Sequence, residues 1–158
     1  MPTLIKHQRL QPVTPVAPGT PEAPVTPEPE IPALATFLAS PHSSCVQLAP
    51  ADNPATLLPY LQQLELICLE FPTFQDGRAF SQALLLRQQR YSGELRAVGD
   101  ILPDICYHLY QCGFDSFLIP DHYPAEDALH CIQAIPHPYQ STQRTPQPWF
   151  RRNPATTG

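Results

Sequence analysis

Short apolar runs alternate with amphipathic stretches through the middle of this chain. Four such runs cover residues 45–49, 66–71, 94–98 and 117–119. The stretches that follow them repeat apolar residues every three or four positions, which is the period of a helix with one buried face. This alternation predicts the element order βαβαβαβα, with parallel strands joined by crossover helices.

Residues typical of helix ends fall between these runs. Asn53 before Pro54 predicts the start of one helix, and Asp76 predicts an N-cap for the next. Gly113 stands where a helix would end on a glycine in the left-handed conformation. Pro59 lies inside the first helix and should distort it, because proline lacks an N–H and crowds the preceding turn.

The predicted fold class is α/β, with a four-stranded parallel sheet built from βαβαβαβα units. Run 66–71 is apolar almost throughout, as expected for a central strand buried on both faces. Phe71 at its end and Phe74 in the following loop are expected to pack. Right-handed crossovers leave two architectures open. One is an open, doubly wound sheet with helices on both faces, and the other is half-barrel-like with helices on one face.

The two ends of the chain differ in composition from this central part. We predict an N-terminal arm at 1–40, in which a proline-rich linker at 12–32 precedes a short helix, an α/β domain at 41–136, and a flexible C-terminal tail at 137–158. Nine of the 22 prolines lie within the first 32 residues, and proline favours extended conformations without backbone donors. Leu4-Ile5 could add an edge strand.

Charge and cysteine content narrow the class of protein. The net charge is −5, and residues 45–135 contain eleven acidic residues against four arginines, so we expect no nucleic-acid binding. Arg144, Arg151 and Arg152 form a basic cluster in the tail, which is either solvated or a docking peptide. Five cysteines without paired spacing fit a reducing compartment. Because no apolar run is long enough to span a membrane, we expect a soluble, cytoplasmic protein without membrane contact.

Ligands of parallel α/β sheets bind at the carboxyl ends of the strands, where loops meet and helices begin. This rule selects polar residues from four loops as one predicted rim. They are Asp52, Glu70, Thr73, Asp76, Arg78, Arg96, Asp100, Asp121 and His122. The candidates for catalytic proton transfer are Glu70, Asp100 and His122, and the candidates for binding an anion or partner are Arg78, Arg96, Asp76 and Gly77.

The charged candidates also have structural explanations. Glu70 and Arg96 stand in apolar strands, where a charge without a partner costs several kcal/mol, so the two side chains could pair with each other. For Asp76 the capping role is sufficient. Arg78 lies at the second position of a helix, where free N–H groups attract anions, although a bond to Asp76, Glu70 or a loop carbonyl accounts for it equally well.

Metal and cofactor sites have little support in the sequence. His108 and Cys112 lie four residues apart on one helical face, but no spacing matches a zinc or iron–sulfur pattern. No cysteine falls on the predicted rim, which argues against a cysteine nucleophile. The turn at 49–52 has no glycine, so we expect no dinucleotide bound in the usual way, and no cofactor or metal is predicted.

Three segments resemble a known bacterial family. They are Phe71-Pro72-Thr73-Phe74-Gln75-Asp76-Gly77-Arg78, Gly93-Glu94-Leu95-Arg96-Ala97-Val98-Gly99-Asp100 and Cys112-Gly113-Phe114-Asp115-Ser116-Phe117. In order and spacing they are similar to the bacterial domain-of-unknown-function family nine-three-four. Ala79, where that family usually has a second glycine, and the long proline-rich insert depart from its pattern. The resemblance implies a small bacterial protein, often encoded beside the sulfite reductase haemoprotein and often labelled an oxidoreductase without an established reaction.

Three hypotheses follow for the function. The first, which rests on the resemblance, is an accessory protein of assimilatory sulfur (sulfite) reduction that binds an anion or a partner at the rim, the partner being the sulfite reductase haemoprotein. The second is an enzyme, an oxidoreductase by resemblance only, that acts on a small anionic substrate held by Arg78 or Arg96. The third is a half-barrel completed by homodimerisation, which would cover exposed edge strands.

Overall fold

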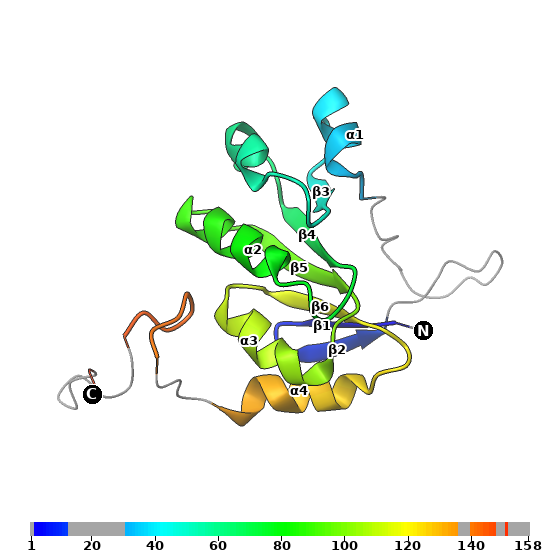
Figure 1. Cartoon of the computed structure of the whole chain (residues 1–158), viewed down its shortest axis with the longest axis vertical. Coiled ribbons are helices and arrows are strands. Elements are labelled where there is room, and N and C mark those ends of the chain that lie inside the picture. Colours follow the sequence, from blue (N-terminus) through cyan, green and yellow to red (C-terminus); the bar gives the residue numbers. More distant parts are fainter. Residues whose placement is uncertain (1, 13–30, 136–139, 148–150, 152–158) are drawn as a thin grey trace.

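The computed structural model describes residues 2–12, 31–135, 140–147 and 151, and Figure 1 shows their arrangement. The strands are β1 (Thr3–Lys6), β2 (Arg9–Pro12), β3 (Cys45–Leu48), β4 (Leu66–Phe71), β5 (Glu94–Gly99) and β6 (Ser116–Ile119). The helices are α1 (Leu34–Ala39), α2 (Arg78–Gln88), α3 (Cys106–Gln111) and α4 (Ala125–Ala134), with 3-10 helices η1 (Pro54–Tyr60) and η2 (Pro103–Ile105). The strands predicted from the apolar runs are β3 to β6, each correct to within one residue at either end.

The strands form one six-stranded sheet in the order β2-β1-β6-β5-β4-β3. Strands β3 to β6 pair in parallel, whereas β1 is antiparallel to both β2 and β6. The prediction of a four-stranded parallel sheet is therefore wrong, because the sheet is mixed and has two further strands. On the side of β6 away from β5, the N-terminal hairpin pairs with backbone groups that would otherwise form an open edge.

The hairpin itself carries little sequence signal. His7 and Gln8 form its turn with φ values of 52° and 56°, the positive values that a type I′ turn requires at both central residues. Such turns usually contain Asn-Gly or Asp-Gly, and strands of four residues are too short to show a clear alternation. Ile5 is buried opposite Phe117. Leu4-Ile5, expected at an edge, thus lies inside the sheet, and β2 forms the edge.

One main hydrophobic core lies between the sheet and the helices. Each described helix that buries apolar side chains contributes them to the same cluster, together with alternate strand residues such as Ile67, Leu69 and Leu95. The crossover helices therefore cover one face, and consecutive parallel strands are neighbours in the sheet. Helices on one face contradict the doubly wound alternative, and the antiparallel hairpin beside β6 departs from the parallel half-barrel alternative as well. The other face carries a smaller cluster around Leu66 and Cys68.

Proline and glycine act on the helices in the way their chemistry predicts. The Asn53 side chain accepts the Ala55 N–H at 3.0 Å, which confirms the N-cap. The helix that follows is a 3-10 helix, and Pro59 inside it cannot donate a helical hydrogen bond. Gly113, with φ of +107°, follows the end of α3 as predicted.

Several predictions concern segments at the two ends of the chain. Most of the proline-rich linker predicted at 12–32, much of the tail predicted at 137–158, and Arg152 lie outside the described residues. Within the tail, Arg144 is described and forms hydrogen bonds with the domain. Among the helices that the structure describes, none has the length and apolar character needed to cross a membrane.

Candidate functional site

The loops that follow β4, β5 and β6 meet at the carboxyl edge of the sheet, and Asp100 joins them. Its carboxylate accepts the Phe74 N–H at 3.3 Å and the Tyr123 hydroxyl at 3.5 Å, while its own N–H donates to the Phe71 carbonyl at 2.8 Å. These bonds tie the loop after β4 to the two neighbouring connections. Asp100, a candidate for proton transfer, is thus engaged as a structural acceptor.

Gly99 allows these loops to approach closely. Its φ is +107°, and a Cβ atom at this position would lie 2.2 Å from the Phe71 carbonyl oxygen. Any other residue would therefore be strained and would push the loop away. Gly77 differs, because no atom lies within 4 Å of the place where its Cβ would be. There is open space beside the start of α2.

The two phenylalanines of the loop have different environments. Phe71 is fully buried, and its ring packs edge-on against Phe80 with the centroids 5.5 Å apart. Phe74 is 45% exposed, so the expectation that both residues pack is wrong for Phe74. The hydrogen bond to Asp100 holds the backbone of Phe74 in place. The loop therefore presents an aromatic side chain from a fixed backbone.

Arg78 begins α2 and forms an ion pair with Asp76. Its Nη2 and Nε atoms lie 2.7 and 3.0 Å from the two carboxylate oxygens, and its backbone N–H donates to the same carboxylate at 3.1 Å. The side-chain and backbone hydrogen bonds from Arg78 lower the pKa of Asp76 below its usual value. The N-cap of α2 is Gly77, so the prediction that Asp76 is the N-cap is wrong, although Asp76 accepts the N–H of the first helical residue from one position earlier. The structural explanation of Arg78, a bond to Asp76, is confirmed. The Arg78 side chain is still 61% exposed.

Arg96 lies nearer the amino end of β5, in a different polar group. Its Nη2 is 3.0 Å from the Glu94 carboxylate, which also accepts hydrogen bonds from Lys6 and Ser116. Burial alone would raise the pKa of Glu94, but the hydrogen bonds from Lys6 and Ser116 and the charge of Arg96 outweigh it and lower the pKa. Arg96 therefore forms an ion pair with Glu94, whereas the sequence had suggested a pair with Glu70.

The other rim candidates are held in separate surroundings. Glu70 is half-buried in β4, the His122 ring lies 4.2 Å from the Tyr123 ring, and Asp52 accepts a backbone N–H of its own loop at 2.8 Å. Among the described residues, no hydrogen bond or ion pair joins the three candidates for proton transfer to one another. The structure therefore brings the loops of the rim together without joining those three side chains.

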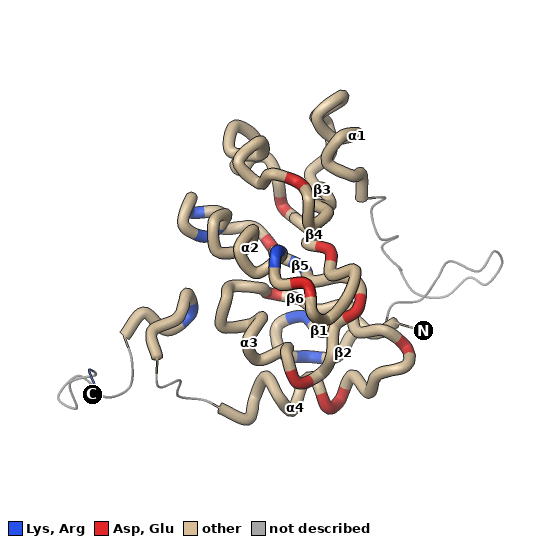
Figure 2. The backbone as a smooth tube through the Cα atoms, in the orientation of Figure 1, with Lys and Arg blue, Asp and Glu red and all other residues tan. Residues whose placement is uncertain are grey.

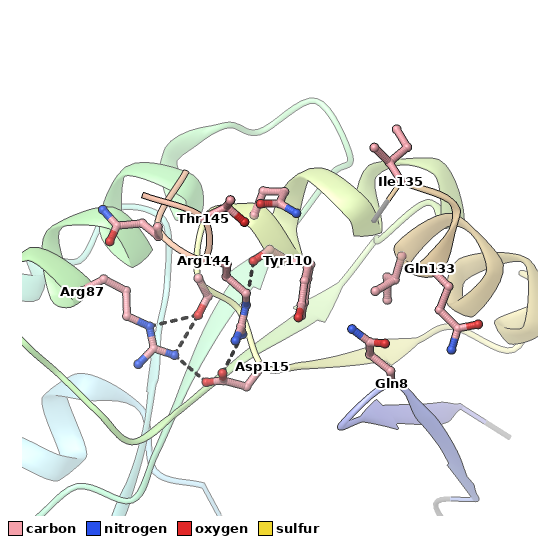
Figure 3. A pocket seen from close by; sticks show the side chains of 12 residues that line it. Gln8, Arg87, Tyr110, Asp115, Gln133, Ile135, Arg144 and Thr145 are labelled. Carbon is pink, nitrogen blue, oxygen red and sulfur yellow. Dashed lines mark hydrogen bonds and ion pairs between the residues drawn. The ribbon is translucent and has the colours of Figure 1, made fainter. Parts of the chain in front are cut away.

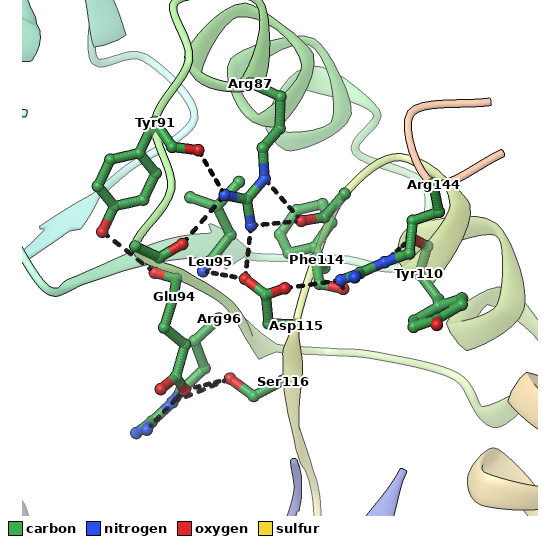
Figure 4. Close-up of polar contacts among 12 residues, drawn as sticks. Arg87, Tyr91, Glu94, Leu95, Arg96, Tyr110, Phe114, Asp115, Ser116 and Arg144 are labelled. Carbon is green, nitrogen blue, oxygen red and sulfur yellow. Dashed lines mark hydrogen bonds and ion pairs between the residues drawn. The ribbon is translucent and has the colours of Figure 1, made fainter. Parts of the chain in front are cut away.

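A second polar cluster lies at the opposite, amino edge of the parallel strands and was not predicted. Arg87, near the end of α2, uses all five of its N–H groups within this cluster. They donate to the carbonyls of Gly113 at 3.0 and 2.7 Å, Tyr91 at 2.7 Å and Gly93 at 3.0 Å, and to the carboxylate of Asp115 (Figure 4). Arg87 is therefore a structural residue that closes the turns before β5 and β6.

Asp115 links this cluster to the C-terminal segment. One carboxylate oxygen accepts Arg87 and the Leu95 N–H at 3.0 Å, and the other accepts Arg144 at 2.7 Å. The Arg144 guanidinium lies over the Tyr110 ring, 4.3 Å from its centroid. The two arginines stand 28 and 29 residues from Asp115 in the chain, so no local spacing could reveal the cluster. The one available sign was an acidic residue directly before an apolar strand.

The two larger cavities of the described structure are both lined in part by residues 140–145. One, of about 660 Å³, is polar and opens between Arg144, Tyr110, Gln8 and Gln133 (Figure 3). The other, of about 770 Å³, lies between α3 and residues 140–143. The predicted rim residues line neither of these two cavities.

His108 on α3 and Cys112, the residue directly after this helix, line the larger cavity. Cys112 Sγ lies 3.8 Å from His108 Nε2. Burial raises the pKa of the Cys112 thiol, which disfavours the thiolate that a nucleophile or metal ligand needs. Within the described part of the chain, no three His, Cys, Asp or Glu side chains are grouped so that they could hold a metal ion.

Comparison with known proteins finds one family. Its model, described as "Bacterial protein of unknown function (DUF934)", matches residues 45–150. The matched span contains the four parallel strands, the rim at their carboxyl ends, and the cluster around Asp115. No curated protein matches the chain.

Proposed function

We propose that this chain is an accessory protein of assimilatory sulfur reduction. The chain belongs to the bacterial DUF934 family of proteins of unknown function. In this proposal the loop at residues 71–78 docks onto a protein partner. The partner we infer is the sulfite reductase haemoprotein, because the sequence resemblance implies that the two are often encoded side by side. The observation that carries the docking role is the exposed side chain of Phe74 on a fixed loop.

Phe74 has the properties of a contact residue for another protein. Its side chain is 45% exposed, although Phe71 three residues earlier is fully buried. Its backbone is bonded to Asp100, so little conformational freedom is lost when a partner immobilises the loop. Aromatic side chains held in this way often contribute a large share of the binding free energy at protein interfaces.

The charges around Phe74 indicate the character of the partner surface. The loops and helix starts at the carboxyl edge carry many acidic residues and, among Lys and Arg, only Arg78, as the red residues in Figure 2 illustrate. The acidic residues are Asp52, Glu70, Asp76, Asp100, Asp104, Asp121, Glu126 and Asp127. A basic surface with an apolar pocket is the complement of this edge, and such charges speed encounter and select the partner.

The exposed guanidinium of Arg78 adds one positive charge to this otherwise acidic edge. Asp76 neutralises it in the free protein, with oxygen atoms 2.7 and 3.0 Å away. A carboxylate on the partner would share Arg78 with Asp76, since the guanidinium can donate to more than one acceptor. We assign this anion-binding role to Arg78 and Gly77, whose surroundings are open.

The test is direct binding between the purified full-length chain and the purified haemoprotein, measured by calorimetry at low and at high salt. We expect binding that weakens as salt rises, because screening reduces the attraction between opposite charges. Phe74→Ala should weaken the affinity by about 30-fold, since a central aromatic residue contributes about 2 kcal/mol. Leu58→Ala is the matched control, because Leu58 is 40% exposed on η1 and should be neutral.

Two results would contradict the proposal. The first is an absence of binding by the wild-type chain at the highest concentrations that calorimetry allows. The second is binding that Phe74→Ala leaves unchanged, which would place the contact on another face. Circular dichroism of both variants would show that they are folded.

A further inference from the structure

Arg144 occupies a site at the amino edge of the sheet that fits a guanidinium group. Its Nε donates to the Tyr110 carbonyl at 3.0 Å, and its Nη2 donates to the Phe114 carbonyl at 2.6 Å and to Asp115 at 2.7 Å. The central carbon of the guanidinium lies over the Tyr110 ring, 4.3 Å from its centroid. Stacking combined with a fork of donors is a property of arginine and not of lysine, whose ammonium is a single compact charge.

The site is held in shape by the domain and not by the tail. Phe114 is fully buried, and Gly113 sets the direction of the chain with φ of +107°. Arg87 bonds both the Gly113 carbonyl and Asp115, and the Leu95 N–H donates to Asp115 as well. The acceptors that face Arg144 therefore stay in position when the tail leaves. A preformed site of this kind loses little conformational entropy when a ligand binds.

The segment that carries Arg144 is a small turn with its own internal bonds. The Thr142 N–H donates to the Thr145 carbonyl at 2.9 Å, and the Thr145 N–H donates to the Thr142 hydroxyl oxygen at 2.9 Å. The same hydroxyl donates to the Gln111 side chain at 2.6 Å. The turn thus directs the Arg144 side chain into the site, while Gln111 of α3 accepts a hydrogen bond from Thr142, the first residue of the turn. These features are those of a short peptide ligand on a surface.

We infer that the amino edge is a binding site for an arginine-bearing turn of a partner protein, and that residues 142–145 are a tethered ligand that competes for it. The charge of the site fits this class of ligand, because the guanidinium is faced by Asp115, by the Tyr110 carbonyl in the last turn of α3 and by the Phe114 carbonyl shortly before β6. The cavity of about 660 Å³ beside Arg144, lined by Gln8 and Gln133 among others, leaves room for residues that flank such an arginine. Arg144 itself is 29% exposed and can exchange with a competitor.

The probe is a fluorescein-labelled synthetic peptide with the sequence of residues 140–147, and its binding to the full-length chain is followed by fluorescence anisotropy. The variant Arg144→Ala empties the site, so it should bind the probe at least about tenfold more tightly than the wild-type chain does. The reason is that a tethered segment competes at an effective concentration in the millimolar range. Arg151→Ala is the matched control, because it removes the same charge from the same tail and should bind like the wild type.

Two further measurements identify the site and its chemistry. Adding Tyr110→Leu to Arg144→Ala should weaken probe binding by about tenfold or more, because the stacking face is lost. A probe with lysine in place of its arginine should also bind Arg144→Ala at least about tenfold more weakly than the arginine probe does, because lysine cannot form the fork of hydrogen bonds. The inference is overturned if Arg144→Ala binds the probe no better than the wild type, or if the lysine probe binds as well as the arginine probe. Unchanged circular dichroism spectra would exclude unfolding as the cause.

Discussion

Replacing Arg87 by methionine should be among the most damaging single substitutions in this protein. The side chain is 15% exposed and joins α2 to the turns before β5 and β6 through five donors. Methionine keeps the aliphatic stem but leaves the Asp115 carboxylate and the carbonyls of Gly113, Tyr91 and Gly93 without these donors. Breaking one partner out of a largely buried ion pair costs about 3–5 kcal/mol. That is a large part of the 5–15 kcal/mol, roughly, by which a domain is stable.

The measurement is urea unfolding of the full-length chain, followed by circular dichroism. Arg87→Lys should fall between the wild type and Arg87→Met, because an ammonium group keeps the charge but cannot form the planar fork. Arg78→Met is the matched control, since its ion pair with Asp76 is at the surface and should matter little. A loss of less than about 1 kcal/mol for Arg87→Met would refute the reasoning, because a bond network of this size would then contribute no more than one ordinary hydrogen bond.

Three other properties follow from the same structure. Glu94 has a pKa below its ordinary value of 4.5, so its ionised carboxylate stabilises the fold above that pH and the stabilisation is lost as the pH falls through the folded-state pKa. When the free energy of unfolding is measured against pH, it should therefore decline less steeply below pH 4.5 in Glu94→Gln than in the wild type. Gly99→Ala should cost about 2 kcal/mol or more in urea unfolding, because φ is +107° and the new Cβ would lie 2.2 Å from a carbonyl oxygen, whereas Gly77→Ala, with open space, should be close to neutral; equal losses would contradict this. Burial raises the pKa of Cys106 to about 12, so a thiol reagent at pH 8 should leave Cys106 unmodified until urea unfolds the chain, and rapid labelling in the native state would contradict this.

The segments by which the chain resembles its family have structural roles in this protein. Gly99 and Asp100 hold the loop that carries Phe74. Gly113 and Asp115 receive Arg87. The functional hypotheses concern the surfaces that these segments help to present at the two edges of the sheet. The carboxyl edge is acidic with an exposed aromatic residue, and the amino edge accepts a guanidinium.

Local chemistry made much of the parallel part of the fold predictable. A run that is apolar except for Glu70 identified β4, and the pair Asn53-Pro54 located the start of η1. Gly113 marked the end of α3. Each of these signals comes from residues within one turn or one strand, and their physical causes act over that same short range.

The candidate sites were less predictable because their partners are distant in the chain. The rule that loops meet at the carboxyl edge was sound, since Asp100 joins Phe74 to Tyr123. Sequence alone could not tell that Phe74 stays exposed or that Arg96 pairs with Glu94. Both outcomes depend on where neighbouring elements lie, and neither has a fixed spacing in the chain.

The sequence by itself determined the order of the elements from β3 to α4, the four parallel strands, the capped start of η1 and the glycine after α3, because periodicity and capping are local. Only the tertiary structure decided that the N-terminal hairpin extends the sheet beside β6, and that Asp115 gathers two arginines from segments 28 and 29 residues away. Those pairings are selected by the burial of backbone and charged groups that the assembled domain would otherwise leave unpaired. A requirement of that kind exists only once the elements have been brought together.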